Sequence, residues 1–164
     1  MANGTKLRKI LLNSWEGVYF KINEDGMNQM MADIASMGGE LFVMDDGWFG
    51  DKYPRRTDKT SLGDWVVDRK KLPSGIGGLL ENARKNGVKF GIWIEPEMVN
   101  PKSELFEKHP DWAIQLPNRE TYYYRNQLVL DLSNPKVQDF VYGVVDKILT
   151  ENPEVAFFLS LIHI

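Results

Sequence analysis

The stretch that decides the fold is Leu41-Phe42-Val43-Met44-Asp45-Asp46-Gly47-Trp48-Phe49-Gly50. The first half of it is apolar without interruption, which is typical of a strand covered on both faces of a parallel α/β sheet. Two carboxylates, a glycine and an aromatic residue follow at once. In barrels built from such strands, the polar residues at the carboxyl ends of the strands form the active site. The stretch therefore predicts a buried strand that ends in a functional site.

The composition is that of an ordinary globular protein. The chain has 164 residues, of which 43% are hydrophobic and 26% charged, so it holds enough apolar material for one core. A formal net charge of -3 argues against a nucleic-acid surface, and no apolar run is long enough to span a bilayer. The chain contains no cysteine, which excludes disulfides and thiolate metal sites. Since residues 1–6 also lack the apolar core of a signal peptide, we expect a cytoplasmic protein with a small, neutral ligand.

Further apolar runs indicate more strands, at residues 10–12, 90–94 and 155–158. The intervals between them are long enough for helical crossovers between parallel strands. Residues 127–132 form an additional extended segment, interpreted as a strand in an insertion.

Helical patterns fill the intervals between the strands. Apolar residues recur at helical spacing in the first interval and face the core rather than a cofactor; they are Met27, Met30, Met31, Ile34 and Met37. A second helix is expected after Pro73 and ends at Asn86-Gly87, where glycine suits the left-handed C-cap. A third begins at Asn134-Pro135, a cap followed by proline at the first helical position.

This alternation of strands and helices predicts an α/β fold, a partial (β/α)8 TIM barrel made of about the first four β/α units. A complete barrel normally needs about 250 residues. We therefore expect residues 1–158 to form the N-terminal half of a TIM-barrel catalytic domain, with two open sheet edges.

Polar and aromatic residues follow each of the first three predicted strands. They are Asn13-Ser14-Trp15-Glu16, Asp45-Asp46-Gly47-Trp48 and Trp93-Ile94-Glu95-Pro96-Glu97. Carboxylates accept hydrogen bonds from hydroxyls, and an indole covers the apolar face of a pyranose. A turn or a loop plug explains any one of these motifs, but their repetition at one end of the sheet favours a carbohydrate site.

Several residues near the strand ends have two interpretations. Pro96 forces a turn, so only one of Glu95 and Glu97 can easily point into the barrel mouth, and the other is structural. Arg125 lies in an aromatic-rich hairpin and is either a ligand contact or an ordinary surface arginine. Other charged residues are interpreted as solvated or helix-end groups: Arg55-Arg56, Lys70-Lys71 and His109.

Long blocks of sequence, in a fixed order, carry a specific resemblance to a known family. They are Trp15-Glu16, residues 41–50, Ser61-Leu62-Gly63-Asp64-Trp65, residues 90–100, His109-Pro110-Asp111-Trp112 and residues 125–132. Together they closely resemble the bacterial α-galactosidases (melibiases) of glycoside hydrolase family 36, over nearly all of residues 11–158. The resemblance implies a retaining hydrolase for terminal α-galactosides such as melibiose and raffinose, working without a metal or another cofactor.

The resemblance also implies roles for particular residues. Asp45 and Asp46 would hold galactose hydroxyls, and Arg125 would be a further substrate contact. Trp93 would line the sugar pocket, and Trp15 would be a second aromatic contact. Paired acceptors suit this task because both form hydrogen bonds when an axial hydroxyl is present, whereas a sugar without that hydroxyl leaves a buried acceptor unpaired and binds more weakly. No role is implied for the two glutamates after the third strand.

The family pattern is not met after residue 158. In the family this strand continues into Lys-Trp-Asp, whose aspartate is the nucleophile, and the acid/base aspartate lies much further downstream. The chain instead reads Leu159-Ser160-Leu161-Ile162-His163-Ile164, which a transposon mosaic-end adapter of sequencing libraries encodes in one reading frame. We therefore expect residues 159–164 to be an adapter artefact and the chain to be inactive alone.

Other functions are compatible with the same residues. A raffinose-synthase-like galactosyltransferase would share the donor-side contacts, and a non-catalytic galactose-binding protein would follow if the complete gene also lacked Lys-Trp-Asp. A Mg²⁺-dependent barrel enzyme could use the carboxylates of Asp45, Asp46, Glu95 and Glu97, although the surrounding tryptophans favour a sugar. A homo-oligomeric parent enzyme is also compatible with the sequence.

Overall fold

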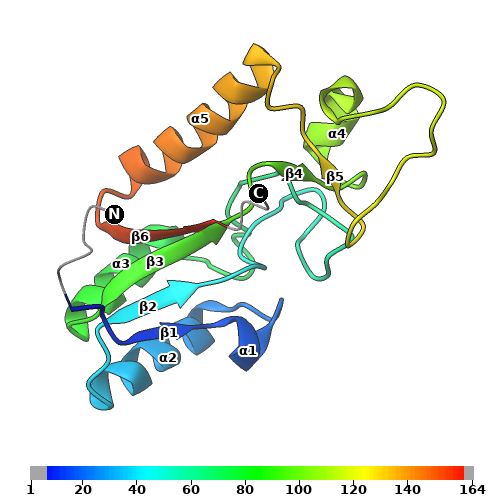
Figure 1. Cartoon of the computed structure of the whole chain (residues 1–164). Helices are drawn as coiled ribbons and strands as arrows, with labels where there is room; N and C mark the ends of the chain where they lie inside the picture. Colours follow the sequence, from blue (N-terminus) through cyan, green and yellow to red (C-terminus); the bar gives the residue numbers. More distant parts are fainter. Residues whose placement is uncertain (1–6, 161–164) are drawn as a thin grey trace.

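A computed structural model describes residues 7–160, and its centre is a parallel sheet with the strand order β1-β2-β3-β6 (Figure 1). The strands are β1 (Leu11–Asn13), β2 (Leu41–Met44), β3 (Lys89–Ile94) and β6 (Val155–Ser160). Each neighbouring pair in this sheet is parallel, so the carboxyl ends of all its strands lie at one edge. The predicted parallel α/β architecture is confirmed.

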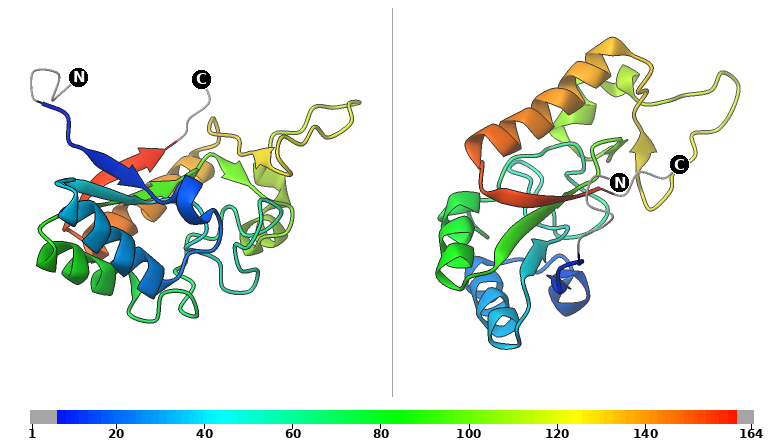
Figure 2. Two further views of the ribbon diagram at one scale, coloured as in Figure 1. Left: turned by 90° about the horizontal axis from the view of Figure 1, so that it is seen from below. Right: turned by 60° about the vertical axis from the view of Figure 1, so that its left-hand side comes forward.

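Three longer helices connect these strands: α2 (Glu24–Ser36), α3 (Gly75–Lys85) and α5 (Pro135–Glu151). Figure 2 shows α2 and α3 side by side beneath one face of the sheet, while the other face carries no helix from residues 7–160. A parallel sheet with helices on one face is the arrangement expected for the first β/α units of a barrel without the remaining strands that would close it.

Capping residues set the helix boundaries. The Asn23 side chain accepts a hydrogen bond from the Gly26 N–H at 2.8 Å before α2, and Asn134 accepts one from the Lys136 N–H at 3.0 Å before α5. After α3, Gly87 adopts a φ of 70°, which a residue without a Cβ reaches at little cost.

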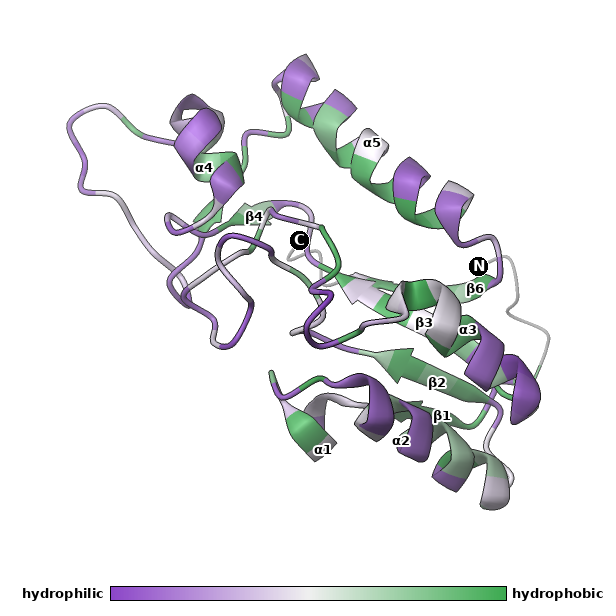
Figure 3. Ribbon diagram, turned by 180° about the vertical axis from the view of Figure 1, so that it is seen from behind, coloured by the Kyte–Doolittle hydropathy of each residue, from purple (hydrophilic) through white to green (hydrophobic). Residues whose placement is uncertain are grey.

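The main core lies between the sheet and the helices α2 and α3. It contains Phe42 and Met44 from β2, and Met27 and Met31 from α2, all fully buried. Figure 3 shows largely hydrophobic strands and helices in which hydrophilic and hydrophobic residues alternate. The prediction that Met37 faces the core is wrong: it is 71% exposed, because it lies beyond the last turn of α2.

The uncovered face of the sheet carries apolar side chains. Gly91 passes so close to Phe157 that an added Cβ would lie 2.9 Å from the Phe157 Cβ, so this position admits only glycine without a shift. Phe157 is 38% exposed and Leu11 is 43% exposed. Exposed apolar residues at both outer strands are expected for a sheet that has not closed into a barrel.

A smaller unit is inserted between β3 and α5. It contains β4 (Met98–Val99), α4 (Glu104–Lys108), the 3-10 helix η1 (Pro110–Trp112) and β5 (Leu128–Val129). β4 and β5 pair in antiparallel orientation, which confirms the extended segment predicted in an insertion. The unit packs its own apolar cluster around Leu105, Trp112 and Leu128.

The last strand ends later than the sequence pattern predicts. β6 runs to Ser160, two residues beyond position 158, and residues 161–164 lie outside the described part of the chain. The interpretation of residues 159–164 as an adapter artefact therefore stays a prediction. The helices of the described part are all too short or too polar to cross a membrane. A small first helix, α1 (Trp15–Val18), follows β1.

Candidate functional site

Asp45 and Asp46 lie where β2 ends, and both are buried, with 9% and 2% of their surface exposed. The Asp45 Oδ2 accepts a hydrogen bond from Asn13 Nδ2 at 2.6 Å, and its Oδ1 accepts one from the Asp46 N–H at 2.7 Å. The Asp45 N–H donates to the Ser14 Oγ at 3.0 Å. Asn13, the last residue of β1, therefore fixes the orientation of the Asp45 carboxylate, and Ser14 holds its backbone.

Asp46 is held by a different partner, the guanidinium of Arg55. Arg55 Nε donates to Asp46 Oδ1 at 2.9 Å and Nη2 donates to Oδ2 at 2.7 Å, a two-pronged geometry that fixes both distance and plane. Burial raises the pKa of Asp46 above its ordinary value, and the Arg55 charge opposes that rise. The two adjacent carboxylates are thus oriented by separate parts of the chain.

Arg55 is fully buried, so its interpretation as solvated charge is wrong. Its guanidinium lies 5.3 Å from the Phe20 ring centroid and 5.7 Å from that of Phe49. The neighbouring Arg56 is exposed, as predicted. Nothing in the local pattern separates the two arginines, because the burial of Arg55 depends on contacts of its loop with Asp46 and with the distant Asn100.

The interpretation of Lys71 as a solvated charge is also wrong. Its ammonium donates to the carbonyl oxygens of Phe20 at 2.9 Å, Gly47 at 2.5 Å and Arg55 at 2.7 Å. Burial lowers the pKa of Lys71 to about 8. One ammonium therefore joins the segment after α1, the turn after β2 and the loop that carries Arg55.

The end of β3 delivers three buried side chains, Trp93, Glu95 and Glu97. Both glutamates are buried, and the expectation that one of them is structural stays a prediction. Burial raises the pKa of Glu95 to about 7; the Arg125 charge opposes the rise, and the Glu97 and Asp46 charges add to it. The Glu95 Oε2 has no hydrogen-bond partner among residues 7–160.

The two tryptophans proposed as sugar contacts differ in exposure. The Trp93 ring is covered by Phe49, with ring centroids 6.4 Å apart, and by Trp65, at 6.1 Å. Trp15 is only half-buried and makes edge contacts with Tyr19 at 5.3 Å and Phe20 at 5.0 Å. Part of the Trp15 ring is thus accessible at the end of β1.

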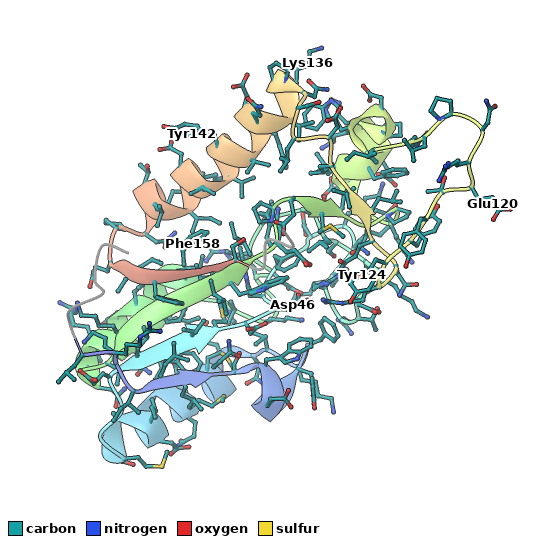
Figure 4. All side chains as sticks on the ribbon, in the orientation of Figure 1. Asp46, Glu120, Tyr124, Lys136, Tyr142 and Phe158 are labelled. Atoms are coloured by element: carbon teal, nitrogen blue, oxygen red, sulfur yellow. The ribbon has the colours of Figure 1, made fainter. Side chains whose placement is uncertain are left out.

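Arg125 is exposed on the inserted unit, and its charge acts on two carboxylates of the strand ends. Asn100 donates to the carbonyl of Asn126, the residue after Arg125, and accepts from Arg55, the partner of Asp46, and the Arg125 charge opposes the raised pKa of Asp46 and of Glu95. In Figure 4, Asp46 at the end of the sheet faces the segment that carries Tyr124, the residue before Arg125. The structure therefore brings Asp45, Asp46, Glu95 and Arg125 to one region.

The described residues show no arrangement suited to a metal. Within residues 7–160, no three or more His, Cys, Asp or Glu side chains form a group that could hold a metal ion. Both oxygens of Asp46 instead face a guanidinium. The interpretation as a Mg²⁺-dependent enzyme gains no support from this geometry.

A parallel β/α sheet with carboxylates and aromatic rings at its carboxyl edge is the arrangement of β/α-barrel enzymes that act on sugars. The Melibiase family model matches residues 2–157, and the chain belongs to this family. The resemblance to family 36 α-galactosidases inferred from the sequence is thereby confirmed.

Relatives with assigned activities agree with this assignment. The chain is 47% identical over 146 residues to the α-galactosidase AgaA of Geobacillus stearothermophilus, covering 89% of this chain and 20% of the relative. It is 43% identical over 148 residues to an α-galactosidase of Escherichia coli, covering 90% of this chain and 20% of the relative. The chain thus spans about one fifth of the length of these relatives.

Solved structures show the same fold. A single-substitution variant of AgaA in complex with 1-deoxygalactonojirimycin superposes with a TM-score of 0.86 at 45% identity, over 92% of this chain and 20% of that protein. A variant of AgaA in complex with stachyose gives a TM-score of 0.90 at 43% identity, over 97% and 22%. The sheet described above is therefore part of a β/α barrel of the family 36 type.

Proposed function

We propose that this chain carries the galactose-recognising strand ends of an enzyme that hydrolyses terminal α-D-galactosides, such as melibiose and raffinose, with retention of configuration. The observation that supports this most strongly is the fixation of Asp45 and Asp46 by separate partners at the carboxyl edge of the sheet. An ionised carboxylate has about four lone-pair positions. Each aspartate therefore keeps acceptor capacity for a sugar hydroxyl after its structural bonds are made.

Each remaining contact has a physical role in this proposal. Arg125 donates to a sugar oxygen, since a guanidinium offers donors and no acceptor. Trp15 packs its accessible edge or face against the sugar ring, and Trp93 forms the apolar wall behind it. Discrimination against an epimer arises because a missing hydroxyl leaves a buried carboxylate oxygen unpaired.

The catalytic carboxylates are proposed to come from outside these residues. A retaining glycosidase needs a nucleophile and an acid/base carboxyl about 5 to 5.5 Å apart. Asp45 is engaged by Asn13 and Asp46 by Arg55, which suits substrate binding better than nucleophilic attack. The Lys-Trp-Asp motif of the family does not occur in the 164 residues. We therefore propose no catalytic residue in this chain and no activity of the chain alone; its cytoplasmic location also stays a prediction.

The test uses the polypeptide that the complete gene encodes. It is incubated with p-nitrophenyl α-D-galactopyranoside and with raffinose, and the anomer first released is followed by NMR. Release of α-galactose supports a retaining hydrolase. Transfer of galactose to a second sugar in place of water would indicate the galactosyltransferase, and binding of galactose without turnover would indicate the non-catalytic binding protein. Either result would overturn the proposed hydrolase.

A further inference from the structure

A buried polar network adjoins the proposed galactose contacts without being one of them. Its centre is the fully buried Asn100, which follows β4. The Asn100 Oδ1 accepts hydrogen bonds from Arg55 Nη1 at 2.8 Å and from the Leu62 N–H at 2.9 Å. Its Nδ2 donates to the carbonyl oxygens of Asp58 at 2.9 Å and Asn126 at 2.8 Å. Both acceptor positions and both donors of the amide are used, so one side chain joins three segments.

One arm of this network leads to Asp46. Arg55 donates to both Asp46 oxygens, while its Nη1 donates to Asn100 and to the Thr60 carbonyl at 2.8 Å. A fully buried guanidinium with this many fixed partners has a single orientation. Because Arg55 is fixed, the carboxylate plane of Asp46 is fixed as well.

The other arm leads to Arg125. Arg125 and Asn126 have φ angles of 51° and 61°, a region that side chains other than glycine rarely adopt and that persists only where the surroundings hold it. The Asn126 carbonyl is held by Asn100, and the Asn126 Nδ2 donates to Asp58 Oδ2 at 3.3 Å. Asn100 therefore secures the turn that presents Arg125.

We propose that Arg55 and Asn100 are positioning residues that hold Asp46 and Arg125 in one fixed geometry for the sugar. The inference rests on the proposed function, because the two residues act through groups that touch galactose there. It makes the recognition of the sugar depend on two buried side chains that do not contact it.

Conservative substitutions separate the two arms. Arg55→Lys keeps a positive charge but loses the fork that orients Asp46. Asn100→Asp keeps an acceptor for Arg55 and for the Leu62 N–H, loses both donors, to Asp58 and to Asn126, and adds a negative charge beside Arg55. The first change thus disturbs Asp46 but not the turn of Arg125, whereas the second disturbs that turn. Arg56→Lys is the matched control, since Arg56 adjoins Arg55 in sequence and is exposed.

The dependence of kcat/KM on pH distinguishes a positioning role from a merely structural one, because a loss of stability alone would not shift it. The charged groups that act on or with Asp46 are Arg55, Lys71 and Arg125, which are cationic, and Asp45 and Glu95, which are acidic. Weakening the Arg55 contact raises the pKa of Asp46 further, so the acid limb of kcat/KM moves to higher pH. Arg55 also opposes the raised pKa of Glu95, and the profiles are therefore repeated with Glu95→Gln present.

The experiment measures kcat and KM for p-nitrophenyl α-D-galactopyranoside from acid to neutral pH, with the polypeptide of the complete gene. Arg55→Lys should lose on the order of 100-fold in kcat/KM, as misplacement of a binding group by about 1 Å does. Its acid limb should shift upward by about 1 pH unit, with or without Glu95→Gln. Asn100→Asp should raise KM on the order of 10-fold, and this increase should add little when Arg125→Lys is already present. Arg56→Lys should match the wild type.

The outcomes separate this inference from the proposed function. A wild-type protein without α-galactosidase activity contradicts the proposed function and removes the basis of the inference. An active wild type in which Arg55→Lys and Asn100→Asp behave like Arg56→Lys overturns the inference alone. Equal losses in both variants with no change in pH profile and full additivity with Arg125→Lys also overturn it, since they indicate a general loss of fold. If Arg55→Lys does not fold, the inference is decided by whether the effects of Asn100→Asp and Arg125→Lys on KM are additive: additive effects overturn it.

Discussion

Asp45→Asn and Asp46→Asn should have different consequences, although the residues are adjacent and both end β2. In Asp45→Asn the single amide oxygen can accept from either Asn13 Nδ2 or the Asp46 N–H but not from both, so one hydrogen bond is lost while no buried charge is left without a counter-ion, and the fold should be retained. What is lost is the charge assistance of hydrogen bonds to the sugar. We expect kcat/KM for an aryl α-galactoside to decrease by a factor that corresponds to about 2 to 4 kcal/mol of lost transition-state stabilisation, the contribution of one or two charge-assisted hydrogen bonds.

Asp46→Asn should damage stability as well as activity. The substitution leaves the Arg55 guanidinium fully buried without its counter-ion, and breaking a buried ion pair from one side costs about 3 to 5 kcal/mol. We therefore expect a clearly lower melting temperature for Asp46→Asn and a much smaller decrease for Asp45→Asn, which loses one hydrogen bond and no ion pair.

The assay combines steady-state kinetics with thermal melts of the complete gene product. Asp51→Asn serves as the control, because Asp51 is exposed and follows the same turn. Unchanged kinetics in both variants would assign Asp45 and Asp46 to a structural role. Equal loss of melting temperature in both would refute the reasoning that only Asp46 neutralises a buried cation.

Three further predictions concern the chain as a whole and Glu95. Burial raises the pKa of Glu95 from 4.5 to about 7, so the folded state binds more protons than the unfolded state between these pH values, and stability falls as pH rises through this window. Glu95→Gln should therefore raise the free energy of unfolding of the chain in urea by about 1 to 2 kcal/mol at pH 8 and by little at pH 4, after allowance for solvent screening. An equal gain for Glu120→Gln would contradict this. The chain alone should bind ANS, because it exposes Leu11 and Phe157 on an unclosed sheet, and it should not hydrolyse an aryl galactoside, because no catalytic carboxylate is proposed within it. A monomer that does not bind ANS and is active would be inconsistent with an open half-barrel. Finally, sequencing of the intact locus should find a lysine-aromatic-aspartate sequence directly after codon 158, and finding residues 159–164 encoded there would refute the adapter interpretation.

The fold could be predicted from the sequence largely because each element carries a local signal. The apolar run of β2 and the caps at Asn23 and Asn134 depend only on neighbouring residues. Asp45 and Asp46 could be placed at the candidate site for the same reason, since parallel strands bring their carboxyl ends to one edge.

The supporting cations of the site could not be predicted in this way. Arg55 and Lys71 lie in polar segments with exposed neighbours of the same charge, and their burial is decided by contacts with residues elsewhere in the chain, such as Asp46 and Phe20. Asn100 likewise acquires its role from partners about 25 to 45 residues away along the chain. Such contacts leave no periodicity in the sequence, because they arise from tertiary structure alone.

The most direct measurement is a crystal structure of the complete gene product with galactose bound. The account predicts galactose hydroxyls within about 2.5 to 3.2 Å of carboxylate oxygens of both Asp45 and Asp46, with Arg125 donating to the sugar and the Arg55 fork on Asp46 intact. Galactose bound away from the carboxyl ends of β2 and β3, or bound there without contact to either aspartate, would contradict the account.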